Sequence, residues 1–174
     1  TVNAYFPANV RWYNWFDGLE MLTKGWVTLS TPLPVAGGSV YILPVHIKGG
    51  EILTLQALNG ALTTQQQAPM PYQLLVTLDE NRTASGRVVI DDGVSVDTVQ
   101  SGKYTEIEYT MTWNNDAYRF VLKNEVIHNG WAAMKNNGTL NEIVVYGLTG
   151  TTKVTNVSIT PVNEYESGYN TTSG

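Results

Sequence analysis

Two adjacent carboxylates, Asp91 and Asp92, stand between an apolar run and Gly93. A carboxylate pair can hydrolyse a glycosidic bond, and together with Asp97 this pair could supply the oxygen ligands that calcium prefers. Neighbouring residues on a strand point to opposite faces, so the pair is poorly placed to flank one glycosidic oxygen, and its spacing does not match an EF-hand loop. Asp-Gly between apolar runs is a strong hairpin signal. The stretch therefore predicts a turn, with catalysis and calcium binding as the alternatives.

The two histidines do not form a recognisable catalytic or metal site. His46 falls in a predicted strand and His128 in a polar loop. A catalytic triad would need a nucleophile, and the sequence contains no G-x-S-x-G or comparable elbow. Two histidines without a third ligand also make a poor zinc site. Both are interpreted as structural residues, and no catalytic residue, cofactor-binding residue or metal ligand is assigned.

Aromatic residues are concentrated near the start of the chain, at Trp12, Tyr13, Trp15, Phe16 and Trp26. Such rings can stack on a pyranose or fill a packing interface. An Asp two residues after a Trp, as at Asp17, can be a glycosidase nucleophile in a sugar-stacking pocket, but Gly18 follows and indicates a turn. We interpret the group as packing residues of a core or of an interface between domains.

The composition excludes several classes of partner. Charged residues make up 14% of the 174 residues and the net charge is −5, with no cluster of Lys or Arg. A nucleic acid or an anionic membrane is therefore not an expected partner. No apolar run is long enough for a membrane span. The absence of cysteine excludes disulfides and thiolate metal sites.

Four N-x-[ST] sequons are present, at Asn81, Asn137, Asn156 and Asn170. Such sites accept N-linked sugar on proteins of the secretory pathway, and a surface of low charge suits the same environment. The sequence therefore predicts a glycoprotein that is secreted or lysosomal/vacuolar. The chain opens at Thr1 without a signal-peptide pattern, as expected of a mature chain or of a piece of a longer one.

The apolar pattern predicts an all-β fold. Residues 104–113 alternate, with Ile107 and Met111 on one face and Glu106 and Glu108 on the other, which is typical of a half-buried antiparallel strand. Turn-forming residues at 114–116 and a second alternating run from 118 complete a hairpin with an aromatic buried face. Further strands are predicted at 26–29, 40–47, 52–56, 73–78, 86–90, 142–146 and 154–159.

Residues 58–71 lose the alternation and gather Gly, Gln and Pro, which is typical of a connector. The sequence therefore predicts two antiparallel β-sandwich domains, at residues 1–57 and 72–174. The first holds too few strands to bury a core of its own and leaves strand edges open. It is expected to be incomplete without upstream polypeptide.

Four stretches together resemble the C-terminal part of glycoside hydrolase family thirty-one, the α-glucosidases and α-xylosidases: NAYFPANVRWYNWFDG, TPLPVAGGSVYILPVHIKGGEILTLQ, QQQAPMPYQLLVTLDENRTASGRVVIDDGVS and GKYTEIEYT. They cover most of residues 1–110. Beyond Trp113 the similarity is a β pattern, carried by EIVVYGL and VTNVSI.

The resemblance implies a catalytic (β/α)₈ barrel that lies upstream and is followed by a proximal and a distal β-sandwich. Residues 1–57 would be the second half of the proximal domain and residues 72–174 the distal domain. The family's nucleophile motif has no counterpart here, and its acid/base aspartate also belongs to the barrel. The implied role is that of a non-catalytic segment of a retaining α-glucosidase, which braces the barrel and needs no cofactor, while the whole enzyme acts on an α-linked oligosaccharide.

The sequence departs from the family pattern at four positions. Asn14, Lys48, Thr54 and Val94 stand where Asp, Arg, Pro and Glu are usual. These changes put in doubt which glycoside is cut, but not the fold. Two alternatives stay open: a stand-alone carbohydrate-binding module or lectin that uses exposed tryptophans, and a calcium-stabilised adhesion domain.

Overall fold

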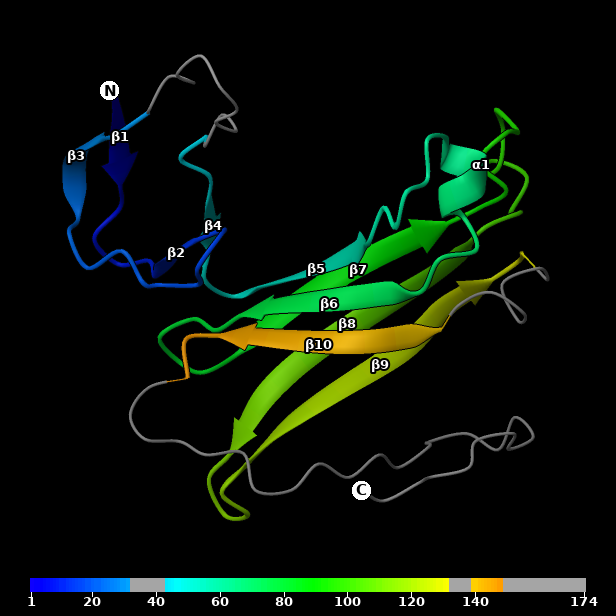
Figure 1. The fold of residues 1–174 in the computed structure, drawn as a ribbon. Coiled ribbons are helices and arrows are strands. Elements are labelled where there is room, and N and C mark those ends of the chain that lie inside the picture. The colour runs from blue at the N-terminus through cyan, green and yellow to red at the C-terminus, as the bar shows by residue number, and fades with distance from the viewer. Residues whose placement is uncertain (32–42, 132–138, 149–174) are drawn as a thin grey trace.

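The computed structural model describes residues 1–31, 43–131 and 139–148 (Figure 1). Nearly every element in these residues is a strand, which confirms the all-β prediction. The elements are β1 (Val2–Phe6), β2 (Trp12–Asn14), β3 (Gly25–Leu29), β4 (His46–Lys48), β5 (Glu51–Gln56), α1 (Thr64–Gln67), β6 (Tyr72–Thr77), β7 (Ala84–Ile90), β8 (Thr105–Asn114), β9 (Arg119–Asn129) and β10 (Leu140–Tyr146). Within the described part of the chain, no helix has the length and apolarity needed to cross a membrane.

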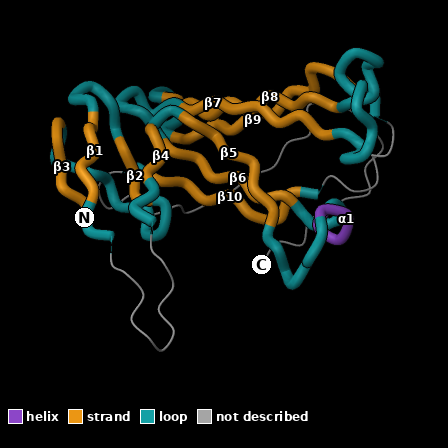
Figure 2. Tube along the Cα trace, turned by 90° about the horizontal axis from the view of Figure 1, so that it is seen from above, coloured by secondary structure: helices purple, strands orange, loops and turns teal. Residues whose placement is uncertain are grey.

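Six strands form one sheet in the order β10-β6-β5-β7-β8-β9. The pairs β5 with β6, β7 with β8 and β8 with β9 are antiparallel, whereas β10 with β6 and β5 with β7 are parallel. The sheet is therefore mixed, which differs from the wholly antiparallel arrangement predicted. The remaining strands pair as β1 with β3 and β2 with β4, and Figure 2 shows all four at one end of the long sheet.

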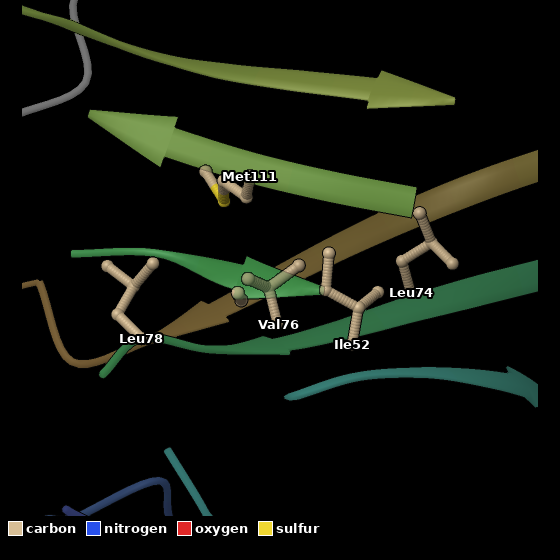
Figure 3. Packing of buried hydrophobic residues seen from close by; sticks show 6 residues of the cluster. Ile52, Leu74, Val76, Leu78 and Met111 are labelled. Atoms are coloured by element: carbon tan, nitrogen blue, oxygen red, sulfur yellow. The ribbon is translucent and has the colours of Figure 1, made fainter. Parts of the chain in front are cut away.

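One face of the long sheet carries the hydrophobic core, shown in Figure 3. Its buried members are Ile52, Leu74, Val76, Leu78, Ala84 and Met111. The three from residues 74 to 78 lie two positions apart, so the strand period places them on the same face. Tyr109 and Phe120 pack against this cluster, which confirms the aromatic buried face of the predicted hairpin.

The hairpin of β8 and β9 is longer than the sequence indicates. Trp113 pairs with Phe120, and the ladder continues as far as Thr105 opposite Asn129. The prediction of a loop around His128 is therefore wrong, because this residue lies in β9. The turn falls at residues 115–118, one position later than predicted.

Other strand predictions differ in their bounds. Residues 43–45 are not strand, and β4 begins at His46, while residues 40–42 of the same predicted strand lie outside the described residues. The predicted strand at 154–159 also lies outside them. The strands β1 and β2 were not predicted, since neither shows a clear alternation of period two.

The predicted connector joins two neighbouring strands of one sheet. Residues 58–71 contain the single-turn helix α1 and lead from β5 into β6, and these strands pair over six residues from Glu51 opposite Thr77 to Gln56 opposite Tyr72. Strand β5 therefore belongs to the same sheet as β6 to β10. In Figures 1 and 2, α1 lies at the far end of the sheet from β1–β4.

Candidate functional site

Arg11, immediately before β2, lies where the N-terminal strands meet the long sheet. Its Nη2 and Nε donate to Oε2 of Glu20 at 2.7 and 3.1 Å. Its Nη1 donates to the carbonyl oxygens of Asp79 and Gly147 at 3.3 Å each. Only 11% of the Arg11 side chain is exposed. One guanidinium therefore ties an N-terminal turn to the ends of β6 and β10.

Tyr13 adds a second link at the same junction. It is fully buried, and its Oη donates to the carbonyl oxygen of Leu78 at 2.6 Å. The Arg11 guanidinium carbon lies 5.2 Å from the centroid of the Tyr13 ring. Burial raises the pKa of Tyr13 to about 12, although the nearby guanidinium acts in the opposite direction. The phenol therefore stays neutral and keeps its proton for this hydrogen bond.

The ion pair between Arg11 and Glu20 shifts the pKa of both side chains. The hydrogen bond from Arg11 lowers the pKa of Glu20 despite partial burial, and the ammonium of Lys24 acts in the same direction. The hydrogen bond to Glu20 raises the pKa of Arg11. Each shift favours the charged form, so the pair is a structural salt bridge and not a proton donor for chemistry.

A groove of about 620 Å³ borders this junction. Its lining includes both signs of charge, from Lys48, Asp79 and Glu80, and hydroxyl groups of β7 and β8. The Asp79 carboxylate is occupied by the backbone N–H of Asn81 at 2.9 Å and by the N–H and hydroxyl of Thr83 at 2.7 and 2.9 Å. It therefore holds a turn, and the described residues that line the groove do not provide a free carboxylate pair for hydrolysis.

The Asp91-Asp92-Gly93 stretch forms bends, closed by its own side chains, at the start of the long loop from β7 to β8, and not the tight hairpin turn that the Asp-Gly signal predicts. Asp91 accepts from the N–H of Gly93 at 2.8 Å and from the Thr98 hydroxyl at 2.7 Å. The Asp92 carboxylate accepts hydrogen bonds from the backbone N–H groups of Val94 and Ser95 and from the Ser95 hydroxyl. These bonds, those from Ser95 first, lower the pKa of Asp92 to about 2. Both carboxylates cap their own loop. Within the described ranges, no group of three or more His, Cys, Asp or Glu is arranged to hold a metal.

The histidines have structural partners, as predicted. The Nδ1 of His46 lies 3.0 Å from the carbonyl oxygen of Pro44, and its ring packs on Phe6. The Nε2 of His128 lies 2.8 Å from the carbonyl oxygen of Gly102, and its ring stacks on Tyr104 at 4.1 Å.

The predicted aromatic group does not come together as one cluster. Tyr13 packs at the junction, where its ring lies 6.2 Å from that of Tyr146. Trp12 contacts Phe6, whereas Trp26 is 75% exposed and contacts Tyr5. Among the described residues of this group, Tyr13 is fully buried between the N-terminal strands and the long sheet, whereas Phe16 and Trp26 are exposed, contrary to the packing role predicted for them.

The sequence gives no clear signal for the residues that make the junction. Arg11, Glu20 and Asp79 lie in turns and loops without a recognisable motif, and two of the Arg11 acceptors are backbone carbonyls. Of the four sequons, only Asn81 is described. It is exposed on the turn between β6 and β7. Asn137, Asn156 and Asn170 lie outside the described residues.

The known proteins whose sequences are similar to this chain are glycoside-hydrolysing enzymes. No protein-family model matches the chain. The α-glucosidase of Hordeum vulgare is 33% identical over 148 residues, which cover 84% of this chain and 16% of that protein. Probable maltase-glucoamylase 2 of Homo sapiens is 32% identical over 160 residues, which cover 91% of this chain and 6% of that protein.

Solved structures show the same fold. The glucosidase II α subunit matches with a TM-score of 0.66 at 20% identity, over 83% of this chain and 15% of that one. The α-1,4-glucan lyase of Gracilariopsis lemaneiformis matches with a TM-score of 0.54 at 19% identity, over 85% of this chain and 14% of that one.

The chain spans only a small share of these proteins, at most 16% of the relatives described above. These matches are to parts of large enzymes, contrary to the alternative of a stand-alone carbohydrate-binding module or lectin. The sequence relatives and the shared fold show that the chain belongs to glycoside hydrolase family thirty-one, as a partial region of its α-glucosidase-type enzymes.

Proposed function

We propose that this chain is the non-catalytic β part of a retaining α-glucosidase, in which it braces an upstream (β/α)₈ barrel. The observation that carries the proposal is the match of the chain to a small part of α-glucosidases. Retaining enzymes use two carboxyl groups about 5 to 5.5 Å apart, one as nucleophile and one as acid/base. The carboxylates of Glu20, Asp79, Asp91 and Asp92 are engaged in structural bonds, so both catalytic groups are expected in the barrel.

The loop between β2 and β3 supplies the bracing surface. It exposes three large apolar side chains, Phe16 at 58%, Leu19 at 68% and Leu22 at 82%. Several large apolar residues exposed on one short loop are typical of a surface that another part of a protein covers. The proposal places the barrel, or the missing half of the proximal domain, against this loop.

The loop is closed onto β2 by backbone bonds and is linked to the long sheet through Arg11. The N–H of Asn14 donates to Leu19 at 2.9 Å and the N–H of Met21 donates to Trp12 at 2.7 Å. Glu20, in the middle of the loop, is held by Arg11, which also binds the ends of β6 and β10. A barrel seated on the loop would therefore be fixed in position relative to the sheet.

The division into a proximal and a distal domain is part of the same proposal. The hydrogen-bonded sheets favour a boundary near Gly49 and Gly50, because β5 begins at Glu51 and pairs with β6. The N–H of Gly49 donates to Arg11 and that of Gly50 to Thr77. The proximal unit would then comprise β1–β4 and be completed by upstream strands.

Secretory routing and N-glycosylation also belong to the proposal. Proteins similar to the chain include the intestinal sucrase-isomaltase of Rattus norvegicus and, in fold, ER glucosidase II. Asn81 is exposed, and its turn is closed by backbone bonds between Asp79 and Thr83 together with the Asp79 carboxylate. A sugar on the Asn81 amide nitrogen would leave those bonds intact. Peptide mapping of the secreted enzyme tests occupancy at each sequon.

Trapping the covalent intermediate tests the assignment of catalysis. A fluorinated glycosyl fluoride that forms a stable glycosyl-enzyme is added to the whole enzyme, which is then digested and mapped by mass spectrometry. The label is expected on a carboxylate outside these 174 residues. A label on Asp17, Asp91 or Asp92 would show that the segment is catalytic after all.

The bracing surface is tested by charge placed on exposed leucines of the whole enzyme. Leu19→Asp and Leu22→Asp are expected to lower its melting temperature, because a carboxylate buried against the barrel is strongly unfavourable. Leu62→Asp is the matched control, since Leu62 is 90% exposed on the link between β5 and β6. Equal melting of all three variants would rule out this loop as the contact surface.

A further inference from the structure

The ribbon of β1 and β3 has two chemically different faces. Its pairing sets Tyr5 opposite Trp26 and Asn3 opposite Thr28. Because side chains alternate along a strand, these four share one face. The other face is apolar and carries Val2, Ala4, Phe6, Val27 and Leu29. It includes Phe6, which is 4% exposed, so it is the face that continues into a packed interior.

The first face presents two open aromatic rings. Tyr5 is 57% exposed and Trp26 is 75% exposed. Their ring centroids lie 5.5 Å apart, and the planes are inclined at 60°. Beside them, the hydroxyl of Thr28 donates to Oδ1 of Asn3 at 2.8 Å, which leaves the Asn3 amide donors available.

This combination matches one class of ligand. A pyranose has an apolar face of C–H groups that packs on an aromatic ring, and hydroxyl groups at its rim that bind neutral amides and hydroxyls. A phosphate or a nucleic acid would require cations, and this face of the ribbon has none. A dry protein interface would have to bury Asn3 and Thr28, which is costly unless every polar group finds a partner.

We propose that Tyr5 and Trp26 form a surface subsite for an α-glucan chain, separate from the catalytic site. The two rings are inclined to each other, which suits a chain that turns from one glucose to the next better than a flat one. The subsite would hold a polymeric substrate on the enzyme. The choice of an α-glucan rests on the proposed function.

Affinity electrophoresis of the whole enzyme tests the subsite. The gel contains soluble starch, and an iminosugar inhibitor saturates the catalytic site so that it contributes no retardation. Trp26→Ala and Tyr5→Ala are each expected to weaken starch binding about tenfold, as truncation of a central aromatic contact does. Trp26→Phe is expected to keep part of the affinity because it keeps a ring.

The control is Tyr118→Ala. Tyr118 is an aromatic residue, 83% exposed, in the turn between β8 and β9, and its loss is expected to leave starch binding unchanged. Hydrolysis of maltose should be the same in all variants, whereas KM for starch should rise only when Tyr5 or Trp26 is truncated. Melting temperatures close to that of the unmodified enzyme would show that the variants fold.

Wild-type retardation of both Trp26→Ala and Tyr5→Ala would overturn the proposal. So would a loss of affinity in Tyr118→Ala of the same size, because it would show that any exposed ring contributes. The α-glucosidase function and the surface subsite can be refuted independently of each other. An enzyme that cleaves no α-glucoside but loses starch affinity in Trp26→Ala would refute the proposed function and keep the subsite.

Discussion

The phenolic oxygen of Tyr13 donates a 2.6 Å hydrogen bond to the carbonyl oxygen of Leu78, 65 residues later in the chain. The donor lies on β2 and the acceptor directly follows β6. The bond therefore crosses from the small N-terminal sheets to the long sheet. It is shielded from water, since Tyr13 and Leu78 are both fully buried.

Tyr13→Phe is expected to destabilise this region by about 1 to 3 kcal/mol, because it leaves the buried Leu78 carbonyl without its donor. It should also change the response to alkali. The pKa of Tyr13 is raised to about 12 from its usual 10, so the unfolded state loses this proton first and stability falls as pH rises between these values. Melting temperature against pH should show a shallower alkaline fall in Tyr13→Phe. Tyr118→Phe, at an exposed position, is the control and should match the unmodified enzyme.

Glu20→Gln is expected to remove an acid-sensitive part of the stability. Arg11 lowers the pKa of Glu20 in the folded state, so the carboxylate stabilises the fold above its ordinary pKa of about 4.3 and loses this contribution as pH falls through the lower folded value. Lys24, which also lowers that pKa, donates to the carbonyls of Val10 and Met21. Melting curves from pH 7 to pH 3 should show the unmodified enzyme and the variant converging in acid.

Arg11→Lys separates charge from geometry in the same pair. Lysine keeps the positive charge but cannot reach Glu20, Asp79 and Gly147 with one planar group. We expect it to melt nearly as low as Arg11→Ala. A fully stable Arg11→Lys enzyme would show that the guanidinium fork contributes little at the junction.

The sequence predicts the strands whose two faces differ and fails where backbone groups decide the structure. Ile107 and Met111 alternate with glutamates, so β8 is visible from the pattern. The second half of β9 cannot be recognised from the sequence pattern, because the consecutive residues Val126 and Ile127 are both about half exposed and show no alternation. Its position is set by the hydrogen-bonded ladder to β8. The Arg11 junction depends on carbonyls 68 and 136 residues away, which no side-chain pattern marks. Residues 58–71 have the composition of a linker although they join neighbouring strands of one sheet, so composition alone does not distinguish a domain connector from a loop within a sheet.

Asp92→Ala is expected to loosen the loop between β7 and β8 without unfolding the sheet. The carboxylate accepts bonds from Val94 and Ser95, and its pKa near 2 keeps it charged at neutral pH. Hydrogen exchange should speed up at the amides of residues 94 and 95 and stay unchanged in β8. Addition of calcium or of a chelator should leave the melting temperature unchanged, since these oxygens already have partners. A chelator-sensitive transition would revive the calcium alternative.

Gly18→Ala tests the packing of β10 against the turn after β2. Gly18 has φ +70°, and an added Cβ would lie 2.5 Å from Cε1 of Tyr146. Gly25 is the matched control, because it has φ +82° and a Cβ added at Gly25 would have no other atom within 4 Å. Gly25→Ala should cost only the strain of a left-handed alanine, about 1 to 2 kcal/mol. Gly18→Ala should cost this strain and the displacement of the tyrosine ring, and should therefore melt lower. Since the Tyr146 hydroxyl also donates to the carbonyl of Trp15 at 3.3 Å, the displaced ring would release β10 from the turn. Equal melting of the two alanine variants would show that Tyr146 does not pack there.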